Sequence, residues 1–363
     1  MAYDPFARGP YPAGVRTMAL SDFARGGRLL PAEVWYPATD ADAGRDVDPA
    51  SRDTYDLVPG FPPFSQDAVR AAAPRAGRHP VVLFSHGYGG HRRQSTFLCT
   101  HLASHGYVVA AVDHTGNTML DVIRQLMQAE SGLKLPSIAE QAKAFAEDRP
   151  ADMTFLLDTL LDDELAAHVD AERVGITGHS FGGWTTIATT ARDRRIRAAV
   201  PLAPAGGWTP LSDEFAVAAG DFAWGRDVPT LYIVADRDTL LPLRGTRDLF
   251  DRTRSPKRLV VLRNADHMHF CDRVEELHEI FRLMPQDRIF EPIRGKIPPI
   301  TELCPGEHAL DTIRGLALAH FDAHLGGSGA AAAVVGGDVV ACLAARGIAV
   351  DVVDAGDRAQ SVA

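Results

Sequence analysis

The chain has 363 residues, of which 46% are hydrophobic and 23% are charged, so it can bury a core and is neither disordered nor fibrous by composition. Its 37 Lys and Arg residues against 47 Asp and Glu residues give a formal net charge of −10, and no basic run is long enough to form a nucleic-acid-binding face. We therefore expect no nucleic-acid partner, and the negative charge disfavours anionic substrates and anionic membrane surfaces.

The first elements that the sequence predicts form a hairpin. β-compatible residues at 17–20 and 29–36 flank the turn-forming segment SDFARGG, which is typical of an antiparallel strand pair. Residues 37–78 are rich in Asp, Pro, Ala and Arg and show no steady period, so we expect a loop there with short helices at most.

From residue 81 onward, short apolar runs alternate with stretches of helical spacing. The runs are of the kind that a strand covered on both faces requires, and helical spacing occurs at 95–105 and 152–161. Strands that alternate with helices predict an α/β fold with a mostly parallel sheet and right-handed crossovers. The apolar runs lie at residues 81–84, 107–112, 173–177, 197–203, 230–235 and 258–262.

Two connections are longer than a simple crossover needs. Residues 117–148 contain the segment MLDVIRQLMQ, whose apolar residues share one helical face, so we expect an inserted helical cap there. Residues 270–306 contain the helical segment EELHEIFRLM in a Pro-rich stretch, and we expect a second excursion near the functional site. The apolar residues of the cap segment are Met119, Leu120, Ile123, Leu126 and Met127.

After a helix predicted at 311–324, the character of the chain changes. We expect one α/β domain at 1–326, followed by a C-terminal extension at 327–363 whose role the residues do not indicate. The segment GGSGAAAAVVGG resembles a flexible spacer, and residues 338–354 could add one helix and a strand.

The most specific signal is the G-x-S-x-G motif at residues 178–182, which follows an apolar run and precedes a helix-compatible segment. In that context the motif is typical of a nucleophile elbow, in which the strand turns sharply into a helix and holds Ser180 in a strained conformation with its hydroxyl exposed. Gly178 and Gly182 would let the strand and the helix approach closely. The sequence therefore predicts Ser180 as a nucleophile.

A serine hydroxyl needs a base, and the base needs an orienting acid. Both follow the serine in the order Ser, Asp, His, each directly after a predicted strand, so their side chains should meet at one edge of the sheet. We predict Asp238 as the acid because it lies deeper in its loop, and Asp236 as the residue that caps the turn. His267 is the predicted base because it lies directly in the turn after the strand.

The oxyanion of an acyl-transfer reaction needs two preorganised N–H donors. We predict that Phe181, which follows the nucleophile, supplies one. The glycine-rich loop SHGYGG at residues 85–90 should supply the other; we assign the Tyr88 N–H, with Gly87 as the near alternative. His86 is expected to hold this loop.

The predicted substrate pocket takes its walls from this loop, the nucleophile helix and the cap. Besides Tyr88 and Phe181, five further residues are expected to bind substrate. For two of them a role without substrate contact is also open. Trp184 could be a core residue, because an aromatic on the nucleophile helix often packs under the sheet, and His269 could be a structural residue. The five are Gly87, Trp184, Leu120, Ile123 and His269.

The four cysteines do not predict a metal or redox site. Cys99, Cys271, Cys304 and Cys342 are far apart, with no CxxC and no Cys/His ligand spacing, so we expect neither a metal nor another cofactor. Cys271 and Cys304 bracket the second excursion and could pair in an oxidising compartment, although buried free thiols are the preferred interpretation.

Targeting signals are not visible in the chain. The N-terminal residues carry acid and proline where a signal peptide needs an apolar stretch, and no apolar run approaches the ~18 residues of a membrane span. We therefore expect a cytoplasmic protein without stable membrane insertion. The sequence leaves open whether it is a monomer or a homodimer.

The segments FSHGYGG, LASHGYVVAAVDH, DRPADMTFLLD, GHSFGGW and ADRDTLLP to NADHMHF resemble, in this order, the platelet-activating-factor acetylhydrolase-like branch of the α/β-hydrolase superfamily. The resemblance implies an eight-stranded sheet flanked by helices and metal-independent hydrolysis of esters with short or truncated acyl groups. It places the nucleophile at Ser180, the base at His267, and the oxyanion donors at Tyr88 and Phe181.

One feature departs from the acetylhydrolases. In the acetylhydrolases the triad acid follows the strand after the nucleophile helix. At that place this chain has PLAP, residues 201–204, which offers no carboxylate. The acid at Asp238 instead looks like the DxDT-type loop of dienelactone hydrolases and cutinase-like polyester hydrolases. The sequence thus predicts a serine hydrolase of small, short-chain carboxylic esters. The alternatives are an amidase or peptidase of the same fold and a non-catalytic ligand-binding homologue.

Overall fold

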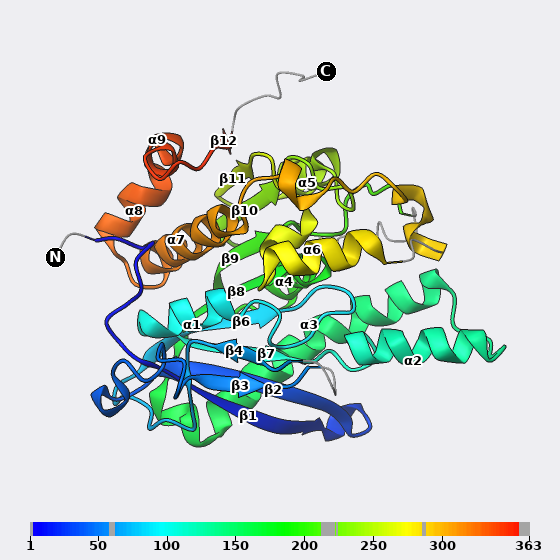
Figure 1. Ribbon diagram of the computed structural model, residues 1–363. Helices are drawn as coiled ribbons and strands as arrows, with labels where there is room; N and C mark the ends of the chain where they lie inside the picture. The colour runs from blue at the N-terminus through cyan, green and yellow to red at the C-terminus, as the bar shows by residue number, and fades with distance from the viewer. Residues whose placement is uncertain (1–2, 58–61, 212–221, 223, 285–287, 356–363) are drawn as a thin grey trace.

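The computed structural model describes residues 3–57, 62–211, 222, 224–284 and 288–355 of the chain (Figure 1). Within these residues, ten strands form one sheet in the order β12-β11-β10-β9-β8-β6-β7-β2-β1-β5, while β3 and β4 pair in a separate two-stranded sheet. The strands from β11 to β7 in this order all pair in parallel. The predicted α/β fold with a mostly parallel sheet is confirmed.

The predicted hairpin is also confirmed, with longer strands than the apolar pattern indicated. β1 (Ala13–Asp22) and β2 (Arg28–Pro37) pair antiparallel along their whole length. The turn between them begins at Asp22, whose side chain accepts hydrogen bonds from the N–H groups of Ala24 and Arg25.

The segment from residue 37 to residue 78 contains short strands in addition to a helical turn, where we expected a loop with short helices at most. β5 pairs with β1 and extends the edge of the main sheet. A strand of two or three residues is too short to show an alternating pattern, so the sequence could not indicate it. The elements are η2 (Asp40–Asp42), β3 (Asp53–Tyr55), β4 (Phe64–Gln66) and β5 (Val69–Arg70).

Each of the six apolar runs forms a strand, as predicted. Because these strands are parallel, their carboxyl ends meet at one edge of the sheet. The six strands and the two of the hairpin make the eight that the resemblance implied, and β5 and β12 add one more at each edge. The six are β6 (His79–Ser85), β7 (Val108–Val112), β8 (Val169–His179), β9 (Ile196–Leu202), β10 (Thr230–Ala235) and β11 (Lys257–Leu262).

Helices cover both faces of the sheet, because the central strands are apolar on both faces (Figure 1). Along β6, Val81 and Leu83 belong to one core cluster, and Val82 and Phe84 belong to the other. α3, α4 and α5 contribute to the first cluster, and α1 and α7 to the second. The bounds of four of these helices are α1 (Thr96–Ser104), α4 (Phe181–Arg192), α5 (Leu243–Arg252) and α7 (Gly306–His324).

The inserted segment forms a helical hairpin of α2 (Met119–Glu130) and the first part of α3 (Ile138–Asp162), which projects beyond the sheet in Figure 1. The expected end of the insert at residue 148 is not a structural break, because α3 continues through Pro150 as the crossover helix that leads to β8. Leu120 and Ile123 are 54% and 42% exposed. These two side chains are therefore not enclosed by the fold, as walls of a covered pocket would be.

The second excursion consists mainly of short helical segments. The longest is α6 (Val274–Leu283), which contacts the turn that carries the predicted base. Cys271 and Cys304, which bracket this excursion, are both free; the Cys271 thiol is buried, as the preferred interpretation expects, and Cys304 is half-buried. The shorter segments are η5 (His267–Phe270), η6 (Arg288–Ile293) and η7 (Ile300–Glu302).

The C-terminal extension packs on the body of the fold. α8 (Gly329–Gly336) lies where we expected a flexible spacer; Ser328 caps it, and it packs on α7. The helix and the strand expected at 338–354 form α9 (Val339–Ala344) and β12 (Val350–Asp354), and β12 pairs antiparallel with β11. Among the described residues, no helix is long and apolar enough to cross a membrane.

Candidate active site

Ser180 lies in the turn between β8 and α4 with φ 60° and ψ −120°, a conformation that a non-glycine residue rarely adopts. The two glycines of the motif make this turn sterically possible. A Cβ atom at Gly178 would lie 2.5 Å from the carbonyl oxygen of Ser85, and one at Gly182 would lie 1.9 Å from the same atom. Ser180 itself stays partly exposed. The local geometry is that of a nucleophile elbow.

The carboxylate of Asp238 pairs with the imidazole of His267. The His267 Nδ1 lies 2.7 Å from the Asp238 Oδ2, and both side chains are buried. The other carboxylate oxygen, Oδ1, accepts hydrogen bonds from the N–H groups of Leu240 and Leu241 at 2.9 and 2.8 Å. The carboxylate is thus held with one oxygen facing the ring.

Asp236 has a different role in the structure. Its Oδ1 accepts hydrogen bonds from the N–H groups of Asn264 and Ala265 at 2.6 and 3.4 Å, which ties the loop after β10 to the turn after β11. The structure therefore pairs Asp238, and not Asp236, with His267.

The Asp238–His267 pair favours a protonated imidazole. Burial opposes the charged ring, but the charge of Asp238 and its hydrogen bond outweigh burial, so the pKa of His267 is raised above its ordinary value of 6.5. Burial also raises the pKa of the Asp238 carboxyl, against the opposing charge of His267. A base with a raised pKa accepts a proton readily from a reacting hydroxyl.

His179, which precedes the nucleophile, brings the base beside the elbow. The centroids of the His179 and His267 rings are 4.5 Å apart, and Phe270 stacks on His179 at 5.4 Å. The Gln94 Nε2 donates a hydrogen bond of 3.1 Å to the His179 Nδ1. Burial lowers the pKa of His179 well below its ordinary value, so its ring is neutral beside His267.

The loop after β6 borders Ser180. A Cβ atom at Gly87 would lie 3.3 Å from the Ser180 Cβ. The Gly87 N–H already donates to the Gln94 Oε1 at 2.9 Å, so it is not the donor that this loop offers to an oxyanion. The Tyr88 N–H, one residue further, stays the predicted donor, together with the N–H of Phe181 at the start of α4.

His86 holds this loop from behind. Its Nδ1 lies 2.7 Å from the Gly87 carbonyl oxygen, and its Nε2 accepts the N–H of His114 at 3.1 Å. The ring is buried, which lowers the pKa of His86 well below its ordinary value. A neutral ring bonded on both nitrogens suits a structural role.

The part of the chain that holds the elbow, the acid–base pair and the glycine-rich loop is similar to known proteins. A family model described as "PETase: PET hydrolase-like" matches residues 70–280. The chain belongs to this PET hydrolase-like family. The match runs from just before β6 into α6 and includes Ser180, Asp238 and His267.

Relatives of this PET hydrolase-like chain carry the names of ester-cleaving enzymes. A platelet-activating factor acetylhydrolase from Bos taurus is 27% identical over 228 residues, 54% of this chain and 48% of that protein. Cutinase est1 from Thermobifida alba is 28% identical over 196 residues, 52% of this chain and 53% of that protein. The chain thus spans about half the length of the curated relatives it matches. The predicted resemblance to acetylhydrolases and cutinases is confirmed.

A solved structure covers more of the chain. A ferulic acid esterase from Streptomyces cinnamoneus matches 89% of this chain and 93% of its own, with a TM-score of 0.62 and 27% identity. The α/β-hydrolase fold of the PET hydrolase-like chain is therefore shown.

The expected substrate-binding residues occupy different environments. Gly87 borders Ser180, as described above. Trp184 is 2% exposed and stacks on Phe181 at 5.1 Å between ring centroids, so it is a core residue, the second of the two roles considered for it. His269 is fully buried. Its Nδ1 accepts the Asp266 N–H, and its Nε2 lies 3.1 Å from the Cys304 carbonyl oxygen, so it has the structural role that was the alternative to substrate binding.

The sequence reasoning missed Phe145 of α3. Its ring packs edge-on against both Tyr88 and Phe181, at 6.2 Å between centroids in each case. An aromatic wall thus lies beside both predicted oxyanion donors. The sequence shows helical spacing at 152–161 and a cap at 117–148, so its pattern assigns Phe145 to the cap and gives no signal that this residue lies beside the nucleophile helix.

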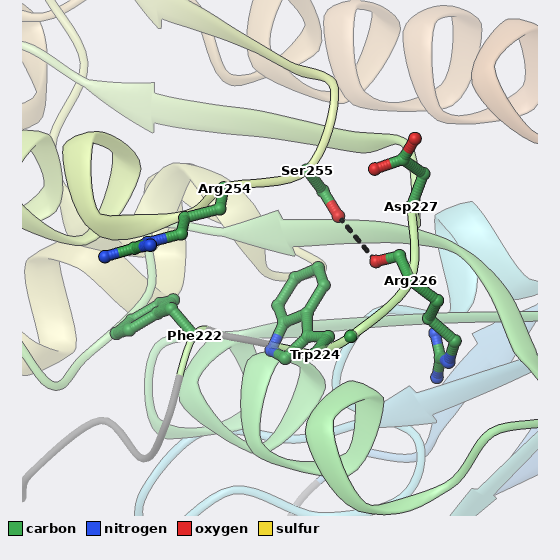
Figure 2. A pocket seen from close by; sticks show the side chains of 7 residues that line it. Phe222, Trp224, Arg226, Asp227, Arg254 and Ser255 are labelled. Atoms are coloured by element: carbon green, nitrogen blue, oxygen red, sulfur yellow. Dashed lines mark hydrogen bonds between the residues drawn. The ribbon is translucent and has the colours of Figure 1, made fainter.

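Two surface pockets lie apart from the predicted nucleophile. One has a volume of about 400 Å³ and is lined in part by Phe222 and Trp224. Figure 2 shows Trp224 near the hydrogen bond from the Ser255 hydroxyl to the Arg226 carbonyl oxygen, with Phe222 farther from this bond. This pocket opens just before β10 and β11, at the opposite ends of these strands from the acid and the base. Another, of about 420 Å³, adjoins the start of α1 and is lined in part by Asp272. Neither is lined by Ser180.

Metal ligands are not grouped in the described part of the chain. No three side chains of His, Cys, Asp or Glu lie together there as they would around a metal ion. The chemistry that the arrangement offers comes from Ser180, His267 and Asp238 together with backbone N–H groups.

Proposed function

We propose that the chain is a serine hydrolase that cleaves carboxylic esters, with Ser180 as nucleophile, His267 as base and Asp238 as orienting acid. The strained Ser180 between β8 and α4, at the sheet edge where Asp238 lies 2.7 Å from His267, carries this proposal. Names of relatives as acetylhydrolase, cutinase and ferulic acid esterase support an ester as the scissile group.

In the proposed reaction the Ser180 hydroxyl attacks the ester carbonyl while the His267 Nε2 takes its proton. Asp238 keeps the other ring nitrogen protonated and stabilises the imidazolium that forms. The N–H groups of Tyr88 and Phe181 stabilise the negative charge on the former carbonyl oxygen. His267 then protonates the leaving alcohol, and afterwards activates the water that releases the acid from Ser180.

We further propose that the acyl group is short. The ring of Phe145 packs against those of Tyr88 and Phe181, which supports an aromatic wall beside the nucleophile that limits the room for a long chain. Because each buried methylene adds only about 0.8 kcal/mol, a long chain that has to bend around this wall gains little binding. Acetyl to hexanoyl esters should therefore react better than palmitoyl esters.

A panel of p-nitrophenyl esters from acetyl to palmitoyl, run beside an acetyl aryl amide, tests the proposal. The wild-type chain should turn over the short esters, Ser180→Ala should be inactive, and a serine-directed phosphonate should label Ser180 alone. Faster cleavage of the amide would support the amidase alternative. Ester turnover by Ser180→Ala, or labelling of another serine, would contradict the proposed nucleophile.

A further inference from the structure

Arg149 of α3 is fully buried behind the loop that carries the predicted oxyanion donor. Its guanidinium donates hydrogen bonds to the carbonyl oxygen of His86 and to the Asn117 Oδ1. It also donates to the Thr185 Oγ1 at 3.0 Å and to the Ser85 Oγ at 3.1 Å. The side chain therefore ties together the end of β6, the start of the insert and α4.

All four acceptors of this guanidinium are neutral. The carboxylate of Asp152, one turn further along α3, is engaged by Arg25 at 2.6 Å, Arg28 at 2.8 Å and His114 at 2.9 Å. Burial lowers the pKa of Arg149 to about 9, so the group still carries its charge at neutral pH. The charge of Asp152 offsets part of the cost of burying this cation, yet the hydrogen bonds of Arg149 all go to neutral groups. A structural link between these elements would not need a charge.

The bonds of Arg149 restrain the oxyanion loop at two points. The His86 carbonyl oxygen belongs to the peptide that leads into Gly87 and Tyr88. Asn117, held by the same guanidinium, accepts the N–H of Gly89 on its own carbonyl oxygen at 3.2 Å. The predicted donor at Tyr88 lies between these two restraints.

The same guanidinium lies over the ring of Phe181, the residue that carries the second predicted donor. Its central carbon is 4.9 Å from the centroid of the Phe181 ring, on the first residue of α4. A buried positive charge beside both donors favours the negative charge that develops on the carbonyl oxygen, and it does so in surroundings where water screens little.

We propose that Arg149 is a positioning residue for the oxyanion site: its buried guanidinium holds residues 86–89 in place and supports the negative charge of the tetrahedral intermediate. The inference rests on the proposed ester hydrolysis by Ser180. It predicts that Arg149 matters for the transition state and for analogues that carry its charge, and little for ground-state binding of a neutral ester.

The test compares folded wild-type protein with Arg149→Met and Arg149→Lys. With p-nitrophenyl acetate, we expect Arg149→Met to lower kcat about 10²-fold to 10³-fold while KM changes less than about threefold. The affinity for a trifluoromethyl ketone, which forms an oxyanion when Ser180 adds to it, should fall by a similar factor. The rate of phosphonate labelling of Ser180 should fall by that factor too. The acid limb of the pH profile should stay in place, because Arg149 does not contact His267.

Arg149→Lys keeps the charge but loses the planar fork, so it should fall between the wild type and Arg149→Met. If Arg149→Met does not fold, the result for Arg149→Lys decides alone, with at least a tenfold loss of kcat at constant KM expected. Arg28→Met is the matched control: it removes a partly buried ion pair with α3 without touching the loop. It should lower the melting temperature and leave inhibitor affinity unchanged.

Three other outcomes would overturn the inference about Arg149. Unchanged kcat and unchanged ketone affinity in a folded Arg149 variant would overturn the inference while the proposed esterase stands. Equal losses in the Arg149 and Arg28 variants would also overturn it, since they would show a purely structural effect. A wild-type chain that reacts with neither the ester nor the phosphonate would overturn the proposed function, and the inference with it.

Discussion

At the scale of single residues, the pair of Asp238 and His267 controls the expected pH dependence. The pKa of His267 is raised above 6.5, and the ring must be neutral to accept the proton of Ser180. The protonated, inactive form therefore persists to a higher pH than for an ordinary histidine. We expect kcat/KM to fall as the pH drops through a value above 6.5.

Asp238→Asn should lower kcat about 10⁴-fold, because an amide favours the wrong tautomer of His267. The acid limb of the residual activity should move to lower pH, because the charge that raises the His267 pKa is gone. Steady-state kinetics from pH 5 to pH 9 measure both effects. Asp236→Asn is the control: the amide oxygen can still accept the N–H of Asn264, so turnover should stay within a few-fold of wild type. A larger loss in Asp236→Asn than in Asp238→Asn would invert the assignment.

At the scale of elements, α3 is anchored to the hairpin turn by the fully buried carboxylate of Asp152, which pairs with Arg25, Arg28 and His114. Burial by itself would raise the pKa of Asp152, but bonds and charge from His114 and Arg28 outweigh it and hold that pKa below its usual range. Asp152→Asn removes the buried charge that Arg25 and Arg28 share, although Arg25 keeps Asp22 and both arginines keep Asp148. It should lower the free energy of unfolding by about 3 kcal/mol at pH 7.

The sign of the pH effect follows from this depressed pKa. The stabilisation by Asp152 is fully present above the pKa of an unfolded aspartate, about 3.9, and is lost as the pH falls towards the lower folded value. Urea unfolding of wild type and Asp152→Asn at pH 7 and pH 3 should therefore show a difference that shrinks at pH 3. A difference that is the same at both pH values would exclude ionised Asp152 as the cause.

The helical hairpin of α2 and α3 bears on substrate choice through Phe145. Because Phe145 packs against Tyr88 and Phe181, Phe145→Ala should open space beside Ser180 and raise kcat/KM for octanoyl relative to acetyl esters about tenfold. The exposed Leu120 and Ile123 provide the control, since their replacement by Ala should leave the chain-length profile unchanged. A shift in the control alone would assign the pocket wall to α2.

At the scale of the whole molecule, the C-terminal extension completes one side of the sheet. β12 covers the edge of β11, and the extension buries Val339, Leu343, Ile348 and Val350 in the core that α1 and α7 share. Truncation after residue 326 would expose an apolar strand edge. We expect the melting temperature to fall by about 5 °C or more and aggregation to increase.

Truncation after residue 355 is the matched control for that deletion, because it keeps α8, α9 and β12. Its melting temperature should equal that of the full chain, as measured by differential scanning calorimetry. Equal stability of the two truncated forms would show that the extension contributes nothing to the folded state.

Features that depend on neighbouring residues can be predicted from the sequence. The six parallel strands and the hairpin follow from apolar runs and turn residues, whose physical cause is local. The elbow at Ser180 follows from the glycines on either side of it, because a side chain at either position would collide with Ser85.

Only the tertiary structure decided what depends on partners distant in the chain. Two aspartates lie two residues apart, and which one faces His267 depends on how two loops meet. Likewise, the contacts of Arg149 join residues 86, 117 and 185, a set without any period in the sequence. The tryptophan side chain at position 184 would suit a substrate pocket as well as a core, and its stacking on Phe181 in the folded chain places it in the core. Local patterns specify elements, but burial and pairing between distant segments specify which side chains face one another.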